Sequence, residues 1–591
     1  MSTPHDKVLD VPDAETVEKV SDAGLATAHP ELVDHPEPVK SKTWLAIIFL
    51  ALSYACAQGI NLIPVNVTNI IEADLGQPEL ATWIGSGYAL ALGVGILIAN
   101  SLSDLLGRRW FIIGGGLLIV VGNIVGATAK SMPAVVAGVI LMSVAQGGST
   151  VTISAAGELV PKKYRGYVIG AMQTGLGVWI VAGSLIGHKL AVSTGPGWRS
   201  VFWMGAGINA GTTIGVALTY FPARALASFR TSGQSFLRTF DFVGLFGVII
   251  VQVLICLGIT YVQIYGAKSA HFLAPFLVGI VLIIPLVLHQ TYIAKNPMLH
   301  PDLFRRVRTF TLVCVVGLVG AMLFYSIEDF FSTYLQILFD GDDQIQIGVD
   351  NIPFALGTNT GGVLAAVLLP VLGPLIGTHS MLTIGVAFQL VFIPLLCVPG
   401  LSGKSMVYAF SFLGGFGIGV MEVMTIMLVQ YAAPDEYLGF SYGILGVMRG
   451  IGGSAGTSIY VTIFSSRATT LVPQYVAKAA LLGGLPASSL PRLLEILTGA
   501  LQAPLSSVPG ATTEIIEASA LALKQAYLRA FRYVWLTCIP FGFIALVCAV
   551  CTKDLSDQLT WKTPQHLKNV KQPEDIAREE AREMVLEERN V

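Results

Sequence analysis

The chain has 591 residues, of which 53% are hydrophobic and only 12% are charged. Soluble domains average about 25% charged residues, so this deficit excludes an ordinary soluble protein and indicates a membrane protein. The net charge of −2 gives no sign of a nucleic-acid partner.

Runs of about 20 apolar residues predict membrane-spanning helices along most of the chain. Prolines interrupt two of these runs, the tenth and the eleventh, without removing their apolar character. Fourteen such spans are predicted, at about 44–66, 82–101, 110–128, 134–156, 168–188, 201–221, 241–261, 272–292, 310–334, 351–373, 381–399, 405–430, 440–463 and 531–551. The sequence therefore predicts an all-α membrane protein.

The spans group as six, two and six. We expect a first six-helix half at 44–221, a linker with two extra helices at 222–309, and a second half at 310–551. Residues 1–43 are rich in acids and lack an apolar segment, so they are expected to form a disordered tail. Residues 552–591 read as a second, charged tail.

Lys and Arg in the short loops predict the orientation of the chain. Alternate loops before residue 350 hold twelve basic residues, namely Arg108, Arg109, Lys162, Lys163, Arg165, Arg224, Arg230, Arg238, Lys295, Arg305, Arg306 and Arg308. The intervening loops hold four, namely Lys130, Lys189, Arg199 and Lys268. The excess places the first group, and with it both termini, in the cytoplasm. The plasma membrane is the expected location, with a vacuolar or vesicle membrane as the alternative.

Residues 464–530 form a long segment that this orientation places outside the membrane. Apolar patches and Pro-Ser stretches within it suggest short amphipathic pieces lying on the membrane surface. A flexible linker is the alternative prediction.

One short stretch occurs twice. PKKYRGYVIG, from Pro161 to Gly170, returns as PDEYLGFSYG, from Pro434 to Gly443, with Pro, Tyr and both Gly at the same offsets. The copies join the fourth and fifth spans of each six-helix half. Equivalent positions in two halves indicate parallel repeats about an axis along the membrane normal. We expect the two loops to approach each other across the cytoplasmic mouth.

The loop after the second span reads NSLSDLLGRR, residues 100–109. This stretch resembles the most specific motif of the major facilitator superfamily, in which an Asp, a Gly and paired Arg join helix ends on the cytoplasmic side. The resemblance predicts a latch formed by Asp104, Gly107, Arg108, Arg109, Glu158 and Arg165. Glu158 is expected to pair with the latch arginines because it ends the fourth span.

Four further stretches resemble a more specific group within this superfamily. WIGSGYALA from Trp83, GELVPKKYRG from Gly157, WRSVFW from Trp198 and RGIGGSAGTSIY from Arg449 are similar to the fourteen-span drug/proton antiporters, and most of all to the fungal trichothecene efflux pump family. Ser143 stands where many of those antiporters carry an Arg in the fourth span.

The resemblance implies a secondary active transporter, not an enzyme, that exports hydrophobic toxins, drugs or secondary metabolites by proton antiport and alternating access. Its expected partners are a small amphipathic or hydrophobic substrate, protons and the lipid bilayer, and it is expected to be a monomer. Proton-coupled uptake of ferric siderophores is one alternative. A non-transporting membrane sensor is another. No metal-ligand cluster or catalytic triad is found in the sequence, so no cofactor is expected.

An ionisable group at mid-membrane is costly and usually has a function or a partner. Glu422 and Arg449 should lie at equal depth on the twelfth and thirteenth spans, which predicts an ion pair. The pair either releases Arg449 when Glu422 binds a proton or is permanently structural. Glu328 and Asp329 are the next candidates, either lining an outer vestibule or lying at headgroup level.

The remaining polar groups within the spans are neutral. A pocket for a large amphipathic ligand needs apolar walls with a few polar anchors. The candidates for those anchors are Gln58, Asn61, Gln146, Gln173, Trp179, Gln252 and Tyr325. Each could instead form an interhelical hydrogen bond.

Overall fold

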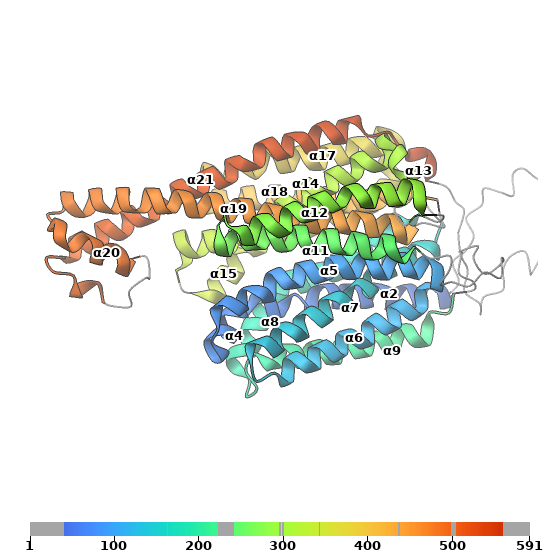
Figure 1. Cartoon of the computed structure of the whole chain (residues 1–591), viewed down its shortest axis with the longest axis horizontal. Helices are drawn as coiled ribbons and strands as arrows, with labels where there is room; N and C mark the ends of the chain where they lie inside the picture. The colour runs from blue at the N-terminus through green and yellow to red at the C-terminus, as the bar shows by residue number, and fades with distance from the viewer. Residues whose placement is uncertain are drawn as a thin grey trace, which may run out of the picture.

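A computed structural model gives the architecture of the chain (Figure 1). It describes residues 41–161, 164–222, 241–266, 268–294, 297, 301–341, 343–434, 438–497 and 504–559. Both predicted tails lie outside this range, apart from residues 41–43 and 552–559. The basic residues of 223–240 and the charged loop residues Lys162, Lys163, Asp435 and Glu436 also lie outside the described residues.

The first half is a bundle of long helices. It comprises α2 (Ser41–Ile60), α3 (Ile63–Asn66), α4 (Thr68–Leu75), α5 (Pro78–Leu106), α6 (Arg108–Thr128), α7 (Met132–Glu158), α8 (Arg165–Ser193) and α9 (Arg199–Thr219). Two helices follow that belong to neither half, α11 (Phe242–Tyr265) and α12 (Ala270–Leu288).

The second half begins after the short α13 (Pro301–Arg305). It comprises α14 (Leu312–Leu335), α15 (Gln344–Asp350), α16 (Ile352–Ile376), α17 (Thr378–Phe392), α18 (Lys404–Ala432), α19 (Leu438–Leu482), α20 (Leu490–Leu497) and α21 (Thr513–Cys551).

The two halves repeat one packing pattern. In the first half α5 packs on α7, α6 on α7 and α9, and α2 on α7, α8 and α9. The second half repeats these pairs with α14, α16, α17, α18, α19 and α21 in the corresponding places. Across the halves, α5 packs on α19 and α8 packs on α16. The repeated stretch at Pro161 and Pro434 therefore sits at corresponding turns, before α8 and before α19.

A tight turn joins the second and third helices of each half. Gly107 ends α5 with φ 99°, and Gly377 ends α16 with φ 84°, and a new helix begins at the next residue in both cases. Only glycine adopts such positive φ values without strain. These turns bring Arg108 and Thr378 to the first positions of α6 and α17.

Thirteen helices of the described chain are long and apolar enough to cross a membrane. The predicted span 440–463 is not among them, although it lies within α19. Arg449 and many glycines lower its hydropathy, and α19 tolerates them because it packs against α5, α11, α14 and α21 instead of facing lipid. The described residues thus form an all-helical membrane protein. The layout of fourteen spans remains a prediction.

Neither expectation for residues 464–530 describes what the structure shows. Helices α19 and α21 continue far beyond the bundle and form a projecting hairpin closed by α20, at the end opposite both ends of the described chain (Figure 1). At 1.5 Å per residue, the 45 residues of α19 span about 68 Å, about twice the hydrocarbon thickness. The hairpin has its own apolar cluster, including Val476, Leu493 and Ile515. Between the two long helices, α20 is a short separate piece.

Candidate transport site

Three charged side chains meet where α5 and α7 end and α6 begins. Nη2 of Arg108 lies 3.0 Å from Oδ1 of Asp104, and its Nε donates to Oε2 of Glu158 at 2.9 Å. The side chains of Arg108, Asp104 and Glu158 are 7%, 5% and 1% exposed. The single-glycine turn at Gly107 makes this possible, because it places Asp104 and Arg108 four residues apart at the same corner.

Asp104 also reaches across to the second half. Its two carboxylate oxygens accept hydrogen bonds from the backbone N–H groups of Gly439, at 3.2 Å, and Phe440, at 2.8 Å. These N–H groups begin α19 and have no partner within the helix, so the carboxylate caps α19. A Cβ at Gly439 would lie 2.5 Å from Oδ1 of Asp104, which explains why the repeated stretch has glycine there.

The other predicted latch residues lie beside this group. Arg109 points to the end of α9, where it donates to the carbonyl oxygens of Ala217, at 2.8 Å, and Tyr220, and lies over the ring of Phe221. Arg165 is buried, and its Nε donates to the carbonyl oxygen of Gly157 at 2.8 Å. The six predicted residues therefore gather at one corner, from which Asp104 bonds the start of α19.

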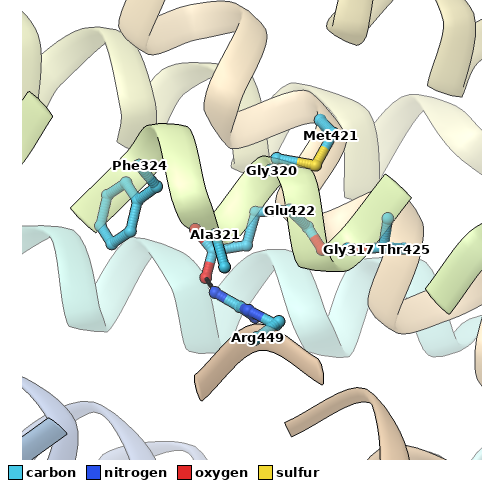
Figure 2. Close-up of a pocket in the computed structure, with 8 residues that line it drawn as sticks. All are labelled: Gly317, Gly320, Ala321, Phe324, Met421, Glu422, Thr425 and Arg449. Atoms are coloured by element: carbon cyan, nitrogen blue, oxygen red, sulfur yellow. Dashed lines mark hydrogen bonds and ion pairs between the residues drawn. The ribbon is translucent and has the colours of Figure 1, made fainter. Parts of the chain in front are cut away.

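A second ionic contact lies deep in the second half. Arg449 on α19 and Glu422 on α18 form an ion pair whose side chains are 16% and 20% exposed (Figure 2). The pair lines a narrow gap, together with small residues of α14, namely Gly317, Gly320 and Ala321. The gap has no room for a water-sized sphere, so a drug-sized ligand does not fit there in the present conformation.

Polar groups from both halves surround this pair. Tyr54 of α2, Tyr325 of α14 and Tyr442 of α19 lie close enough to interact electrostatically with Glu422 and Arg449. Tyr54 belongs to the first half. The ion pair is therefore next to the boundary between the halves.

A chain of hydrogen bonds extends from Tyr54 across that boundary. The Tyr54 hydroxyl donates to Oε1 of Gln173 at 3.4 Å, and Nδ2 of Asn359 donates to the Gln173 backbone carbonyl at 2.7 Å. We call Tyr54, Gln173, Tyr325, Glu422, Tyr442 and Arg449 the central polar cluster. Sequence reasoning missed Tyr54, Tyr442 and Asn359, because a tyrosine or asparagine in a span gives no sign of which helix it faces.

Three of the predicted anchors are used within the first half. Gln146 donates to Gln58 at 2.7 Å, and Gln58 donates to Ser149 at 3.1 Å. Asn61 is fully buried and its Oδ1 accepts from Asn123 at 3.1 Å. These bonds join α7 to α2, and α6 to the end of α2. In this conformation they have the geometry of interhelical bonds.

The last predicted residues are dispersed. Trp179 of α8 packs over Gly59, and the ring of Tyr325 packs against Gly453. Gln252 of α11 is fully buried between α5 and α19. Glu328 and Asp329 lie on α14, and their side chains fall outside the described residues.

One charged group was not anticipated. Lys404 at the start of α18 contacts Asp340 at 2.7 Å and also Asp350, whose side chains are 1% and 2% exposed. Asp340 precedes α15 and Asp350 is its last residue, and the folded chain brings both to one lysine of α18. Among the described residues, no group of three or more His, Cys, Asp or Glu could hold a metal ion.

The comparison with known proteins defines the family. The profile of the fungal trichothecene efflux pump (TRI12) matches residues 4–583, nearly the whole chain. The chain belongs to this family. The prediction from the latch motif and the flanking stretches is therefore confirmed.

Relatives within this pump family are distant but extend along almost the full length. The MFS-type transporter prx5 of Penicillium rubens is 28% identical over 541 residues, covering 89% of this chain and 94% of its own. The trichothecene efflux pump TRI12 of Fusarium sporotrichioides is 23% identical over 559 residues, covering 92% and 91%.

Solved structures support the fold. The human organic anion transporter MFSD10 (TETRAN) aligns with a TM-score of 0.52 at 11% identity, over 86% of this chain and all of its own. The proton:xylose symporter XylE, solved with 6-bromo-6-deoxy-D-glucose, aligns with a TM-score of 0.51 at 12% identity, over 74% and 91%. At such low identity they establish the major facilitator fold alone.

Proposed function

We propose that this protein exports uncharged or weakly charged lipophilic small molecules by exchange with protons, and that Glu422 is the proton-binding group. The observation that carries the proposal is the Glu422–Arg449 pair, which is partly buried beside the boundary of the two halves. Membership in a family of efflux pumps supports the direction of transport.

Protonation of Glu422 would change the balance of charge in the cluster. The carboxylate now offsets the charge of Arg449, and a neutral carboxylic acid would leave that charge buried without a counter-ion. The arrangement of α18 and α19 seen here would then be less stable relative to one that exposes Arg449. A proton thereby shifts the equilibrium between two conformations, which is what alternating access requires.

The test measures accumulation of lipophilic toxins in transporter-deficient yeast that expresses this chain. We expect lower accumulation than in cells without it, and we expect a protonophore to abolish the difference. Glu422→Gln should lose the export that depends on the proton gradient. Glu517→Gln, on the exposed part of α21, is the matched control and should behave as the wild type.

A double variant separates coupling from a structural role. Neutralising both partners, as Glu422→Gln with Arg449→Gln, removes the buried charges together and spares the cost of leaving one unpaired. Proton-driven export that survives in the double variant would show that the pair is only structural. A parallel measurement with ferric siderophores tests the reverse direction, since iron accumulation would overturn export and leave the fold unaffected.

A further inference from the structure

Gln252, in the extra helix α11, has an unusual environment. Its side chain is fully buried, and neither its amide nitrogen nor its amide oxygen has a hydrogen-bond partner among the described residues. Buried side-chain amides are nearly always paired, because an unpaired one loses its bonds to water without compensation. The group therefore calls for a partner that this conformation does not supply.

Two glycines form the place where the amide lies. A Cβ at Gly93 of α5 would overlap Nε2 of Gln252, and one at Gly450 of α19 would lie 3.0 Å from it. Gln252 thus reaches into the contact between α5 and α19, the contact that joins the two halves. Gly450 follows Arg449 directly in α19. The Gln252 amide therefore contacts the residue next to a member of the central polar cluster.

Helix α11 is attached to α19 by polar contacts. Ser458 donates to the carbonyl oxygen of Ile259 at 2.9 Å, and Sγ of Cys256 lies 3.9 Å from the carbonyl oxygen of Gly450. These contacts keep Gln252 with the second half when the halves move. Gly93, which covers the amide, lies on α5 of the first half. Separation of α5 from α19 would therefore expose the amide.

The corresponding contact between α8 and α16 contains a partly buried amide. There Asn359 fills the space beside Gly177 and donates to the carbonyl oxygen of Gln173. That amide has its partner in the closed arrangement and needs no other. Asn359 has a hydrogen-bond partner in this conformation, and Gln252 has none among the described residues. This difference indicates that Gln252 does more than occupy the space beside the two glycines.

We infer that Gln252 is a substrate-contacting residue that selects for neutral hydroxyl-bearing molecules. A primary amide offers one donor group and one acceptor in the same plane, and a hydroxyl group can accept from the first and donate to the second. A charged group beside it would be buried without a counter-ion, because the amide carries no charge, and such burial is costly. The inference rests on the proposed export of lipophilic molecules and specifies which of them the pump prefers.

The test uses one trichothecene in two forms, with its hydroxyl groups free and with all of them acetylated. Acetylation removes the hydroxyl donors and keeps oxygen acceptors. Gln252→Met keeps the size of the side chain and removes the amide. We expect it to reduce export of the free form about threefold to tenfold more than export of the acetylated form, which is the value of the one hydrogen bond that only the free hydroxyl can donate.

Two further variants control for folding. Gln389→Met changes another buried glutamine, on α17 away from the α5–α19 contact, and should alter neither rate. Gln252→Asn keeps an amide on a shorter side chain and should prefer the free form over the acetylated form less than the wild type does. This variant tests the inference even if the methionine variant folds poorly. An equal loss for both compounds would mean that Gln252 acts only on the contact between helices, and would overturn the inference. If the wild type exports neither compound, the proposed function itself fails for this class, and the inference fails with it.

Discussion

The two contacts between the halves are built on one plan but held by different forces. In α5–α19, glycines of α19 from Gly450 to Gly439 pack closely on α5, and the charged group at Asp104 lies at the end of this contact. In α8–α16, Gly166 packs directly on the backbone of Ala366, and no charged residue stands where Asp104 does, since α16 has Pro374 there.

The corners behind these contacts differ in the same way. Asp104 offers its carboxylate to the opposite half, whereas Asp554 caps α17 within its own half by accepting from the N–H and hydroxyl of Thr378 at 2.8 and 2.9 Å. A charge-assisted contact can be released by a change in charge, and a backbone contact cannot. Of these two contacts, the α5–α19 one carries a charged group between the halves, which suits it to electrostatic control.

The largest expected effect comes from Arg108→Met. It would leave Asp104 and Glu158 buried side by side without their cation, and breaking a buried pair in this way costs about 3–5 kcal/mol. The variant should unfold at a lower temperature in detergent and lose export. Arg305→Ala is the control, since its pair with Asp302 is largely exposed and contributes little. Equal thermal stability of the two variants would contradict an electrostatic latch.

The next largest effect is expected at glycines of the repeated stretch. Gly166 and Gly439 occupy equivalent positions in its two copies. A Cβ at Gly166 would overlap the carbonyl oxygen of Ala366, and one at Gly439 would press on Asp104, whereas one at Gly443 would meet Ser101 at an ordinary 3.5 Å. Gly166→Ala and Gly439→Ala should each lower the free energy of unfolding by about 1–3 kcal/mol. Gly443→Ala should be tolerated. Thermal unfolding of the three variants checks this, and equal sensitivity at Gly443 would show that the close approach is not the cause.

A smaller effect is expected at Asn359. Asn359→Ala removes one hydrogen bond across α8–α16 and should cost about 0.5–1.5 kcal/mol. The loss should appear in thermal stability without a change in the pH dependence of export, because no charge is involved. A shift of that pH profile would mean that the α8–α16 side also takes part in proton coupling.

The smallest effect is a pH dependence at the second corner. Burial raises the pKa of Asp554, but hydrogen bonds from Ser556 and Thr378 outweigh it and hold the pKa at about 2. Because this pKa is below the ordinary value of about 3.9, the carboxylate stabilises the fold above pH 4 and this contribution disappears as the pH falls towards 2. Melting temperatures of the wild type and Asp554→Asn should therefore differ at pH 7 and converge as the pH approaches 2. A constant difference would refute the assignment.

Much of the fold follows from local sequence patterns. Apolar runs predicted the spans because hydrocarbon thickness fixes their length, and the spacing of Asp104, Gly107 and Arg108 predicted a latch because a one-glycine turn fixes their geometry. Residues 464–530 could not be read this way. Whether their apolar positions face a membrane or one another depends on which helices lie beside them.

By itself the sequence determined a helical membrane protein with two related halves, the family to which it belongs, and the corner where the latch residues gather. These features depend on hydropathy and on residues close together in the chain. Only the tertiary structure decided that Asp104 caps α19 some 335 positions away, that Asn359 bonds Gln173, and that Gln252 lies between Gly93 and Gly450 with no hydrogen-bond partner in the described part of the chain. Such contacts depend on how distant helices are turned towards each other, and that rotation is set by the packing of the whole bundle.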